Sequence, residues 1–297
     1  MRLGYPCVNL SVGCTSSSTF RLSSYSEVRL YESVGRDLAC LDRILRFNVE
    51  RGLLHFRVSS DLVPLASHPV CVHDWRTHFM DEFRAIGRYA ESNGMRLSMH
   101  PGQYTLLNTP RSDVLTNSIR DLEYHDAVLS AMGLGRDAKI QIHVGGVYGD
   151  KGTAMRRFLE AFENLTPAVR SRLVIENDER FFTVSDCVVL SQSADVPVVV
   201  DSLHHRANDG GLSLSEAISL AVSTWKASDG PQMLDYSSQD PQRRAGSHAY
   251  TIGESDFRMF VEEVAEIDCD VMLEIKDKER SAMKALEILR SRSVRPQ

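Results

Sequence analysis

The sequence predicts a single (β/α)8 barrel domain over residues 1–297. Eight short apolar runs alternate strictly with eight helical patterns, and this alternation is typical of a parallel sheet covered by helices. Most of the runs are rich in Val, Ile or Leu without clean polar alternation, as in strands buried on both faces. An open doubly wound sheet would usually carry a glycine-rich turn after its first strand, whereas residues 9–13 read NLSVG.

The predicted strands are short and end where polar residues begin. In chain order they are 2–7, 53–58, 95–99, 139–142, 172–175, 196–200, 232–236 and 270–275. The predicted helices between them have apolar residues at three- and four-residue spacing. They are 27–51, 77–93, 113–132, 153–165, 183–193, 213–225, 255–267 and 279–292. Ser24 with Glu27, and Ser213 with Glu216, have the spacing of capping boxes.

Composition excludes several classes of protein. Hydrophobic residues make up 42% and charged residues 25%, no apolar run reaches membrane-spanning length, and the N-terminus lacks a long apolar segment. We therefore expect a cytoplasmic protein, associated with the nucleoid only through DNA, with no membrane partner and no implied protein partner. The six scattered cysteines contain no CxxC pair, which disfavours a zinc ribbon or a disulfide framework and fits a reducing cytosol.

The net charge of −6 argues against a uniformly basic nucleic-acid binder. A local basic rim or bound divalent cations can reverse the field where a partner binds. The charge therefore leaves a nucleic-acid partner open.

Residues that can bind a metal lie at or near the C-terminal ends of six consecutive predicted strands, and these ends meet at one face of a barrel. They are His100, His143, Glu176, Asp201 with His204 three residues later, Asp235 and Glu274, and His248 lies in the loop after the seventh strand. Any one of them alone is more simply explained as a residue at a strand end that faces solvent or forms an ordinary hydrogen bond. Carboxylates that converge raise each other's pKa unless cations relieve the repulsion, so the set predicts divalent metal ions.

The mixed imidazole and carboxylate set without thiolate suits Zn²⁺ or Mn²⁺. Two or three cations that share a central carboxylate are typical of phosphodiester hydrolysis. Glu176 lies midway round the ring and is the predicted bridge. The predicted catalytic residues are Glu176, His100, His143 and Glu274.

Several motifs along the whole chain resemble the UV damage endonuclease family, a relative of the endonuclease IV fold. The motifs are Gly4-Tyr5, Asn9-Leu-Ser, Phe56-Arg-Val-Ser-Ser60, His100-Pro-Gly-Gln-Tyr104, Gln141-Ile-His143-Val-Gly-Gly146, Ile175-Glu-Asn177, Asp201-x-x-His204, Gly246-Ser-His248-Ala and Met272-Leu-Glu274-x-Lys276. The resemblance implies a (β/α)8 barrel with up to three divalent ions. It also implies incision of damaged double-stranded DNA immediately 5′ of cyclobutane pyrimidine dimers and 6-4 photoproducts, with abasic sites as a further substrate.

By the same resemblance, His100 and His143 hold one ion with Glu176. Glu176, Asp201, Glu274 and the strand-seven residue hold a second, and His204 and His248 hold a third. Family members commonly carry Lys-x-His-x-Ser at strand seven, with that lysine reported as modified in the metal site. Here Met233-Leu-Asp235-Tyr-Ser237 stands there instead. Because Asp235 is a hard oxygen donor, we expect Mn²⁺, with Zn²⁺ or Mg²⁺ as alternatives.

The resemblance also implies that Gln103 and Tyr104 probe the damaged site. An aromatic ring can replace stacking that a lesion has lost, and a photoproduct is cheaper to extrude than an intact base. Tyr5, Asn9 and His68 are carried over as further DNA- or lesion-binding residues. The simpler alternatives are packing on the barrel rim for Tyr104, core packing for Tyr5 and an ordinary loop histidine for His68.

Candidate phosphate contacts lie in or beside the loops of the predicted active face: Arg21, Lys151, Arg156, Arg157, Arg243, Arg244 and Lys276. Three other functions remain open. The same barrel serves divalent-metal sugar isomerases, the chain has the features of a general abasic-site endonuclease, and the strand-seven departure allows a non-catalytic damage-binding protein.

Overall fold

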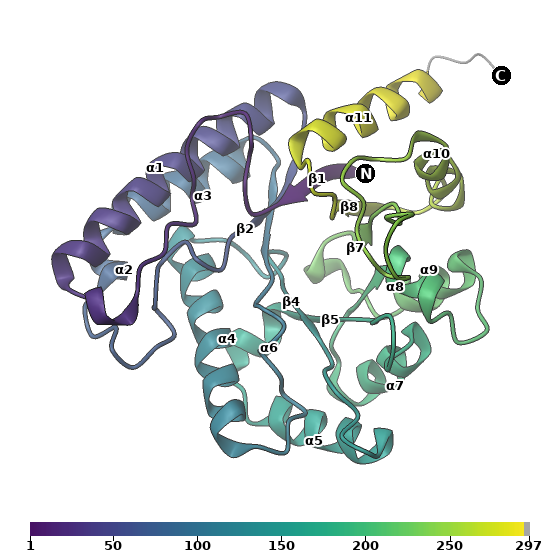
Figure 1. Cartoon of the computed structure of the whole chain (residues 1–297), viewed down its shortest axis with the longest axis horizontal. Helices are drawn as coiled ribbons and strands as arrows, with labels where there is room; N and C mark the ends of the chain where they lie inside the picture. The colour runs from purple at the N-terminus through teal and green to yellow at the C-terminus, as the bar shows by residue number, and fades with distance from the viewer. Residues whose placement is uncertain (294–297) are drawn as a thin grey trace.

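The computed structural model, which describes residues 1–293, is a closed barrel of eight parallel strands in sequential order (Figure 1). The strands are β1 (Arg2–Pro6), β2 (His55–Val58), β3 (Arg96–Met99), β4 (Ile140–His143), β5 (Leu173–Glu176), β6 (Val198–Asp201), β7 (Gln232–Tyr236) and β8 (Cys269–Leu273). The pairing of β1 with β8 closes the barrel. This confirms the predicted fold class; the last four residues of the predicted domain lie outside the described residues.

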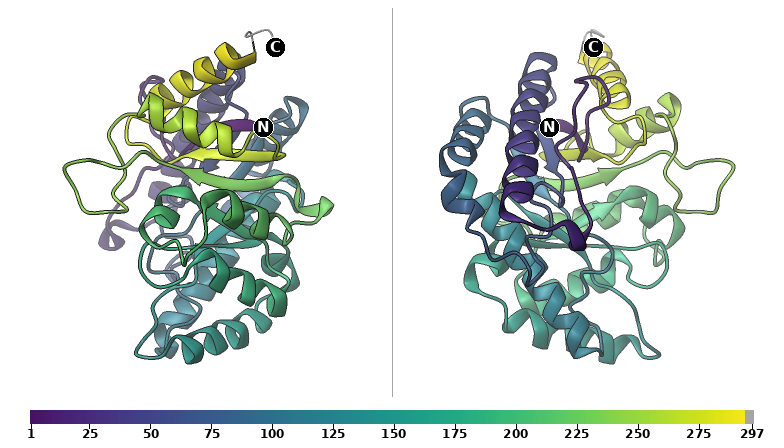
Figure 2. Two further views of the ribbon diagram at one scale, coloured as in Figure 1. Left: turned by 90° about the vertical axis from the view of Figure 1, so that its right-hand side faces the viewer. Right: turned by 60° about the vertical axis from the view of Figure 1, so that its left-hand side comes forward.

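Helices surround the barrel on its outer side (Figures 1 and 2). They are α1 (Glu27–Arg51), α2 (Trp75–His78), α3 (Met80–Ser92), α4 (Ser112–Met132), α5 (Lys151–Glu163), α6 (Pro167–Arg172), α7 (Val184–Ala194), α8 (Ser202–Ala207), α9 (Leu214–Val222), α10 (Glu254–Glu263) and α11 (Glu279–Ser293). Short 3-10 turns lie at η1 (Leu22–Ser24) and η2 (Ala227–Asp229). No helix among the described residues is long and apolar enough to cross a membrane.

Helix ends follow the predicted local signals in part. The capping box of Ser213 with Glu216 is confirmed at the start of α9. The predicted box of Ser24 with Glu27 is wrong, because Ser24 belongs to η1 and the extended Ser26 instead accepts a hydrogen bond from the Arg29 amide. Arg172, predicted to begin a strand, is the last residue of α6.

The two faces of the strands differ in polarity. Alternate residues such as Leu97 and Met99 belong to the apolar layer between barrel and helices, as expected for the outer face. The intervening residues face the barrel interior, and many of them are buried polar or charged groups, Arg57, Arg96 and Gln141 among them. The strands are buried on both faces as predicted, but the inner layer is held by ion pairs and hydrogen bonds rather than by apolar contact alone.

Gly4 shows how closely β1 and β2 approach each other. A Cβ atom at Gly4 would lie 1.7 Å from the carbonyl oxygen of His55. Only glycine fits this position, because any side chain would displace the neighbouring strand.

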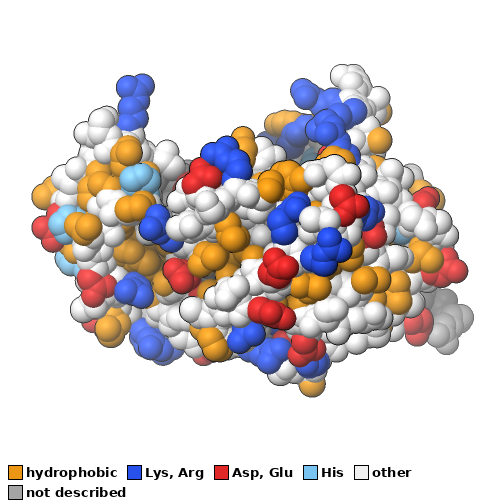
Figure 3. All heavy atoms as spheres, turned by 90° about the horizontal axis from the view of Figure 1, so that it is seen from below, with side chains coloured by type: hydrophobic (Ala, Val, Ile, Leu, Met, Phe, Trp, Pro, Cys, Tyr) orange, Lys and Arg blue, Asp and Glu red, His pale blue; other side chains and the backbone are white. Residues whose placement is uncertain are grey.

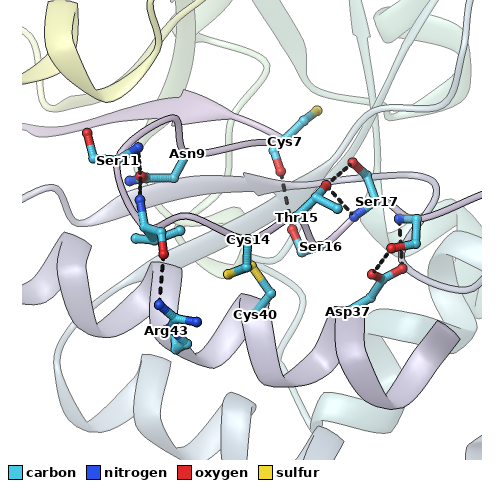
Figure 4. Close-up of a disulfide and its surroundings, with 12 residues drawn as sticks. Cys7, Asn9, Ser11, Cys14, Thr15, Ser16, Ser17, Asp37, Cys40 and Arg43 are labelled. Carbon is cyan, nitrogen blue, oxygen red and sulfur yellow. Dashed lines mark hydrogen bonds between the residues drawn. A yellow bond between two sulfur atoms is a disulfide. The ribbon is translucent and has the colours of Figure 1, made fainter. Parts of the chain in front are cut away.

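The loop between β1 and α1 is fastened to α1 by polar contacts and one disulfide (Figure 4). Arg43 donates to the Val12 carbonyl at 2.8 Å, and Asp37 accepts hydrogen bonds from both the amide and the hydroxyl of Ser18. Cys14 and Cys40 are joined as a disulfide with their Cα atoms 5.9 Å apart. The cysteine spacing, which fitted a reducing environment, gave no indication of this pair, because the two residues meet only when the loop folds back on α1.

Candidate metal centre

Four histidines form an arc at the C-terminal end of the barrel. His100 follows β3, His143 ends β4, His204 lies in α8, and His248 lies in the loop after β7. The centroids of successive rings are 5.5, 5.7 and 6.1 Å apart. Predicted site residues from four different segments therefore meet at one mouth.

Glu176, at the end of β5, lies at the centre of the tightest group. Its Oε1 atom is 3.3 Å from Nε2 of His100 and 2.6 Å from Nε2 of His143. Among residues 1–293, His100, His143 and Glu176 form a group of three in which every ligand atom lies within 4.8 Å of the others. Burial raises the pKa of Glu176, but the two imidazoles outweigh burial and hold this pKa well below its ordinary value. The carboxylate is thus ionised and ready to accept a cation.

Backbone carbonyls fix the orientation of two of these rings. Nδ1 of His100 donates to the Pro101 carbonyl at 2.8 Å, and Nδ1 of His248 donates to the Glu274 carbonyl at 2.6 Å. Each contact requires a proton on Nδ1, so in the neutral ring the lone pair lies on Nε2. Metal-binding histidines commonly have this arrangement, and here it directs Nε2 of His100 toward Glu176.

Asp201 and His204 are held together by the start of α8. Oδ1 of Asp201 accepts the amides of Leu203 at 2.7 Å and His204 at 2.8 Å, while Oδ2 lies 3.3 Å from Nδ1 of His204. Burial lowers the pKa of His204, but the Asp201 carboxylate outweighs burial and raises this pKa to about 9. Asp201 therefore caps the helix and orients the imidazole at once.

Arg57 organises the layer directly beneath the histidines, and sequence reasoning did not single it out. Nη2 of Arg57 lies 3.0 and 2.9 Å from the two carboxylate oxygens of Asp235 and donates to Oε1 of Gln141 at 3.0 Å. Nη1 donates to Glu274. Arg57 lies one residue before the end of β2 and Gln141 two residues before the end of β4, so the alternation of the two strands was the signal that could have identified both as inward-facing.

Asp235 does not join the metal-binding group. It is fully buried, both of its oxygens contact Arg57, and Oδ2 also accepts from Nε2 of Gln141 at 2.5 Å. Met233, the residue at the family's lysine position, packs against Val174 and Val199 lower in the barrel. Both oxygens of Asp235 are therefore engaged with Arg57 in this structure, beneath the group formed by His100, His143 and Glu176.

The predicted lesion-binding residues lie in two different environments. Gln103 and Tyr104 are exposed in the loop after β3, Tyr104 with 79% of its surface accessible, and His68 is exposed in the loop after β2. Tyr5 and Asn9 are buried: the Tyr5 hydroxyl donates to Asn48 at 2.6 Å and accepts from Asn9 at 2.7 Å. The structure places this pair between the barrel and α1 rather than on the surface of the mouth.

The mouth lies between projecting loops. In the left view of Figure 2, the loop after β7 and the loop after β1 extend beyond the barrel on the same side. Figure 3 shows a hollow between two projections that carry Lys or Arg side chains near their tips. Arg21 in the first loop, and Arg243 and Arg244 in the second, are exposed. Basic side chains therefore flank an acidic, histidine-rich centre.

Metal binding at this centre should depend on pH. Burial lowers the pKa of His143, but Glu176 outweighs burial and raises this pKa to about 9, so the imidazole is protonated at neutral pH. A cation must displace this proton, and we expect apparent Mn²⁺ affinity to rise between pH 7 and 9 by up to about tenfold per pH unit for each proton displaced. Titration calorimetry in buffers of different ionisation enthalpy measures the protons released. Affinity that is flat across this range would contradict the prediction.

Comparison with known proteins gives a consistent result. A family model described as UV-endonuclease UvdE matches residues 1–295. A protein named UV DNA damage endonuclease from Clostridium perfringens is 39% identical over 292 residues, covering 98% of this chain and 71% of that relative. Another of the same name from Bacillus cereus strain 03BB102 is 30% identical over 301 residues, covering 98% and 95%.

Solved structures agree with the sequence comparison. The crystal structure titled SacUVDE superposes with a TM-score of 0.95 at 43% identity and covers 99% of both chains. D-psicose 3-epimerase from Clostridium cellulolyticum H10 superposes with a TM-score of 0.59 at 14% identity, covering 98% of this chain and 99% of that one. At that identity the epimerase shares only the barrel.

Proposed function

Because the chain belongs to the UV-endonuclease UvdE family, we propose that it hydrolyses damaged double-stranded DNA immediately 5′ of UV photoproducts in a reaction that requires divalent metal ions. The observation that carries the proposal is the position of Glu176 between the Nε2 atoms of His100 and His143 at the open mouth. The proposed substrates are cyclobutane pyrimidine dimers and 6-4 photoproducts, with abasic sites as a further substrate.

His100, His143 and Glu176 are the proposed ligands of a resident divalent cation, with Mn²⁺ preferred over Zn²⁺ or Mg²⁺. When bound, such a cation supplies a Lewis acid for the phosphate and lowers the pKa of water. Glu176 keeps its position because Gln141 donates to its other oxygen from below. The Nδ1 contact of His100 prevents its ring from turning away.

Asp201, His204, His248 and Glu274 are the proposed ligands for further cations. The His204 and His248 rings are neighbours, and Oε2 of Glu274 lies 3.8 Å from Nε2 of His248. We assign Asp235 to Arg57 rather than to a cation. The proposed donor set therefore keeps the three carboxylates Glu176, Asp201 and Glu274 and has no ligand from β7.

A nicking assay on supercoiled plasmid tests the proposed function. We expect nicks in irradiated plasmid with Mn²⁺, none with EDTA, and far fewer in unirradiated plasmid. Absence of metal-dependent nicking would favour a non-catalytic damage-binding protein. Mapping the cut on a defined photoproduct duplex separates incision 5′ of the lesion from general abasic-site cleavage.

Tyr104 is the residue we propose to replace lost stacking at the lesion. Tyr104→Ala should lower the affinity for a photoproduct duplex by about fivefold to a hundredfold, which corresponds to the ~1–3 kcal/mol of one base–aromatic contact. Tyr104→Phe keeps the ring and should retain most of the affinity. Equal losses in both variants would assign the effect to the hydroxyl group instead. Fluorescence anisotropy in EDTA measures affinity without incision.

A further inference from the structure

Exposed aromatic side chains gather on the loops around the mouth. Tyr104, Tyr148 and Phe181 follow the consecutive strands β3, β4 and β5, and are 79%, 45% and 41% exposed. Among residues 1–293 the other aromatic side chain of comparable exposure is Tyr250, in the loop after β7. All four thus lie in loops that leave the C-terminal ends of strands. Exposed aromatic side chains that gather at one face are a feature of a binding site.

Tyr148 is held rigidly although it is partly exposed. Its φ of 49° lies in the left-handed region, which a bulky side chain rarely adopts. One face of its ring lies over Gly146, where an added Cβ would be 3.3 Å from the ring, and the guanidinium of Arg157 lies 5.4 Å from the ring centroid. Nε of Arg157 donates to the Asn108 carbonyl at 2.8 Å. Strained residues of this kind concentrate at functional sites, and this one presents a fixed ring.

Phe181 is also presented by a fixed loop. The Asp178 carboxylate accepts the amides of Arg180 at 2.8 Å and Phe182 at 3.1 Å, and that of Phe181 between them. This turn buries Phe182 completely and leaves Phe181 outside. Since burying a Phe side chain is worth about 1.5–3 kcal/mol, leaving Phe181 exposed beside a buried Phe182 needs a reason.

The loops that carry Tyr148 and Phe181 are tied to each other. Lys151, directly after the first loop, pairs with Asp186 of α7 at 2.8 Å. The same ammonium lies 5.5 Å from the ring centroid of Phe182. These contacts join the two loops, which limits their relative motion and lowers the entropic cost of binding a ligand to both.

We propose that Tyr148 and Phe181 extend Tyr104 into an aromatic arc on which unpaired bases of a DNA strand stack. The inference deepens the proposed function and rests on it. The loops of Tyr148 and Phe181 begin directly after the proposed metal ligands His143 and Glu176, so both rings belong to loops that adjoin the centre. Every base has a π-face, so these contacts hold a distorted strand whatever its sequence.

The charges around the arc favour a nucleic acid over a protein partner. Arg180, next to Phe181, has 54% of its side chain exposed, and its only described ion pair is a 3.7 Å contact with the adjacent Glu179. Arg156 is also exposed beside the loop of Tyr148. Exposed aromatic rings with exposed arginines beside them are features of a single-strand binding surface.

The test uses the Mn²⁺-loaded full-length protein and an undamaged duplex with 2-aminopurine in a short unpaired bubble. Stacking on a ring quenches 2-aminopurine, so we expect quenching by the wild type that is reduced in Tyr148→Leu and in Phe181→Leu. Each of these substitutions should also weaken binding by about fivefold or more, the lower end of the range for one stacked base. Tyr148→Phe and Phe181→Tyr keep a ring and should stay within about twofold of wild type.

Val222→Ala is the matched control, because Val222 is 41% exposed at the C-terminal end of α9, on the opposite face of the barrel. If the two Leu variants quench 2-aminopurine and bind the duplex as the wild type does, the proposal of the aromatic arc is refuted. Equal loss in the Leu and the ring-keeping variants also overturns it, since folding or a hydroxyl contact would then explain both. If the wild type nicks irradiated plasmid but does not quench 2-aminopurine, only the proposal of the aromatic arc is refuted. If it quenches 2-aminopurine but does not nick, only the proposed incision is refuted.

Discussion

Glu176→Gln is expected to abolish metal-dependent nicking of irradiated plasmid, with a loss of at least about a hundredfold. The substitution keeps the shape of the side chain but removes the charge that lies between His100 and His143. Loss of an outer-sphere partner of a metal site costs about 10–100-fold, and a direct ligand should cost more. Rates of plasmid nicking under saturating Mn²⁺ measure the effect, and anisotropy with lesion DNA should show that binding survives.

Glu179→Gln is the control for this experiment. Glu179 lies three residues further along the same loop and is partly exposed, and it does not belong to the metal-binding group found among the described residues. It should nick at close to the wild-type rate. Undiminished nicking by Glu176→Gln would refute the assignment of Glu176 as the central ligand.

Arg57→Met is expected to destabilise the metal-free protein by about 3–5 kcal/mol, the range for removing one partner of a buried ion pair. The substitution leaves Asp235 fully buried without its cation and removes the partner of Glu274 as well. Urea unfolding in EDTA, followed by circular dichroism, measures the free energy of unfolding.

The double variant Arg57→Met with Asp235→Leu separates an ion pair from simple packing. If the penalty comes from an unpaired buried carboxylate, removing that carboxylate should recover part of the lost stability, because the two positions are coupled. A penalty below about 1 kcal/mol in the single variant, or full additivity in the double variant, would contradict the assigned pair. Arg46→Met, which removes an exposed ion pair with Asp42, should change stability by less than about 1 kcal/mol.

The fold could be predicted from the sequence because its signals are local. The bounds of α1, residues 27–51, follow from the spacing of its apolar residues and from Gly52, which ends the helix in the left-handed region. The short apolar runs located all eight strands, with ends displaced by up to two residues. Ser24 and Ser26 both lie just before α1 and could cap it. Ser26 is the cap because it is extended, whereas Ser24 belongs to the preceding η1 turn.

Only part of the candidate site could likewise be predicted from local signals. The rule that strand ends meet at one mouth is enough to gather His100, His143 and Glu176, because it depends only on where each strand stops. Whether an inward-facing carboxylate meets a cation site or an arginine depends on residues far away in the sequence. Asp235 and Arg57 are 178 residues apart and meet only when the barrel closes.

The sequence by itself determined the barrel, the order of its elements and the gathering of His100, His143 and Glu176 at its mouth. Only the tertiary structure decided that Asp235 pairs with Arg57, that Tyr5 is buried against Asn48, and that Tyr148 and Phe181 are presented beside Tyr104. The physical reason is the sequence separation of the interacting residues, because helix and strand patterns are set by neighbours along the chain. The partner of a buried charge and the exposure of a loop side chain are set by contacts across the closed barrel.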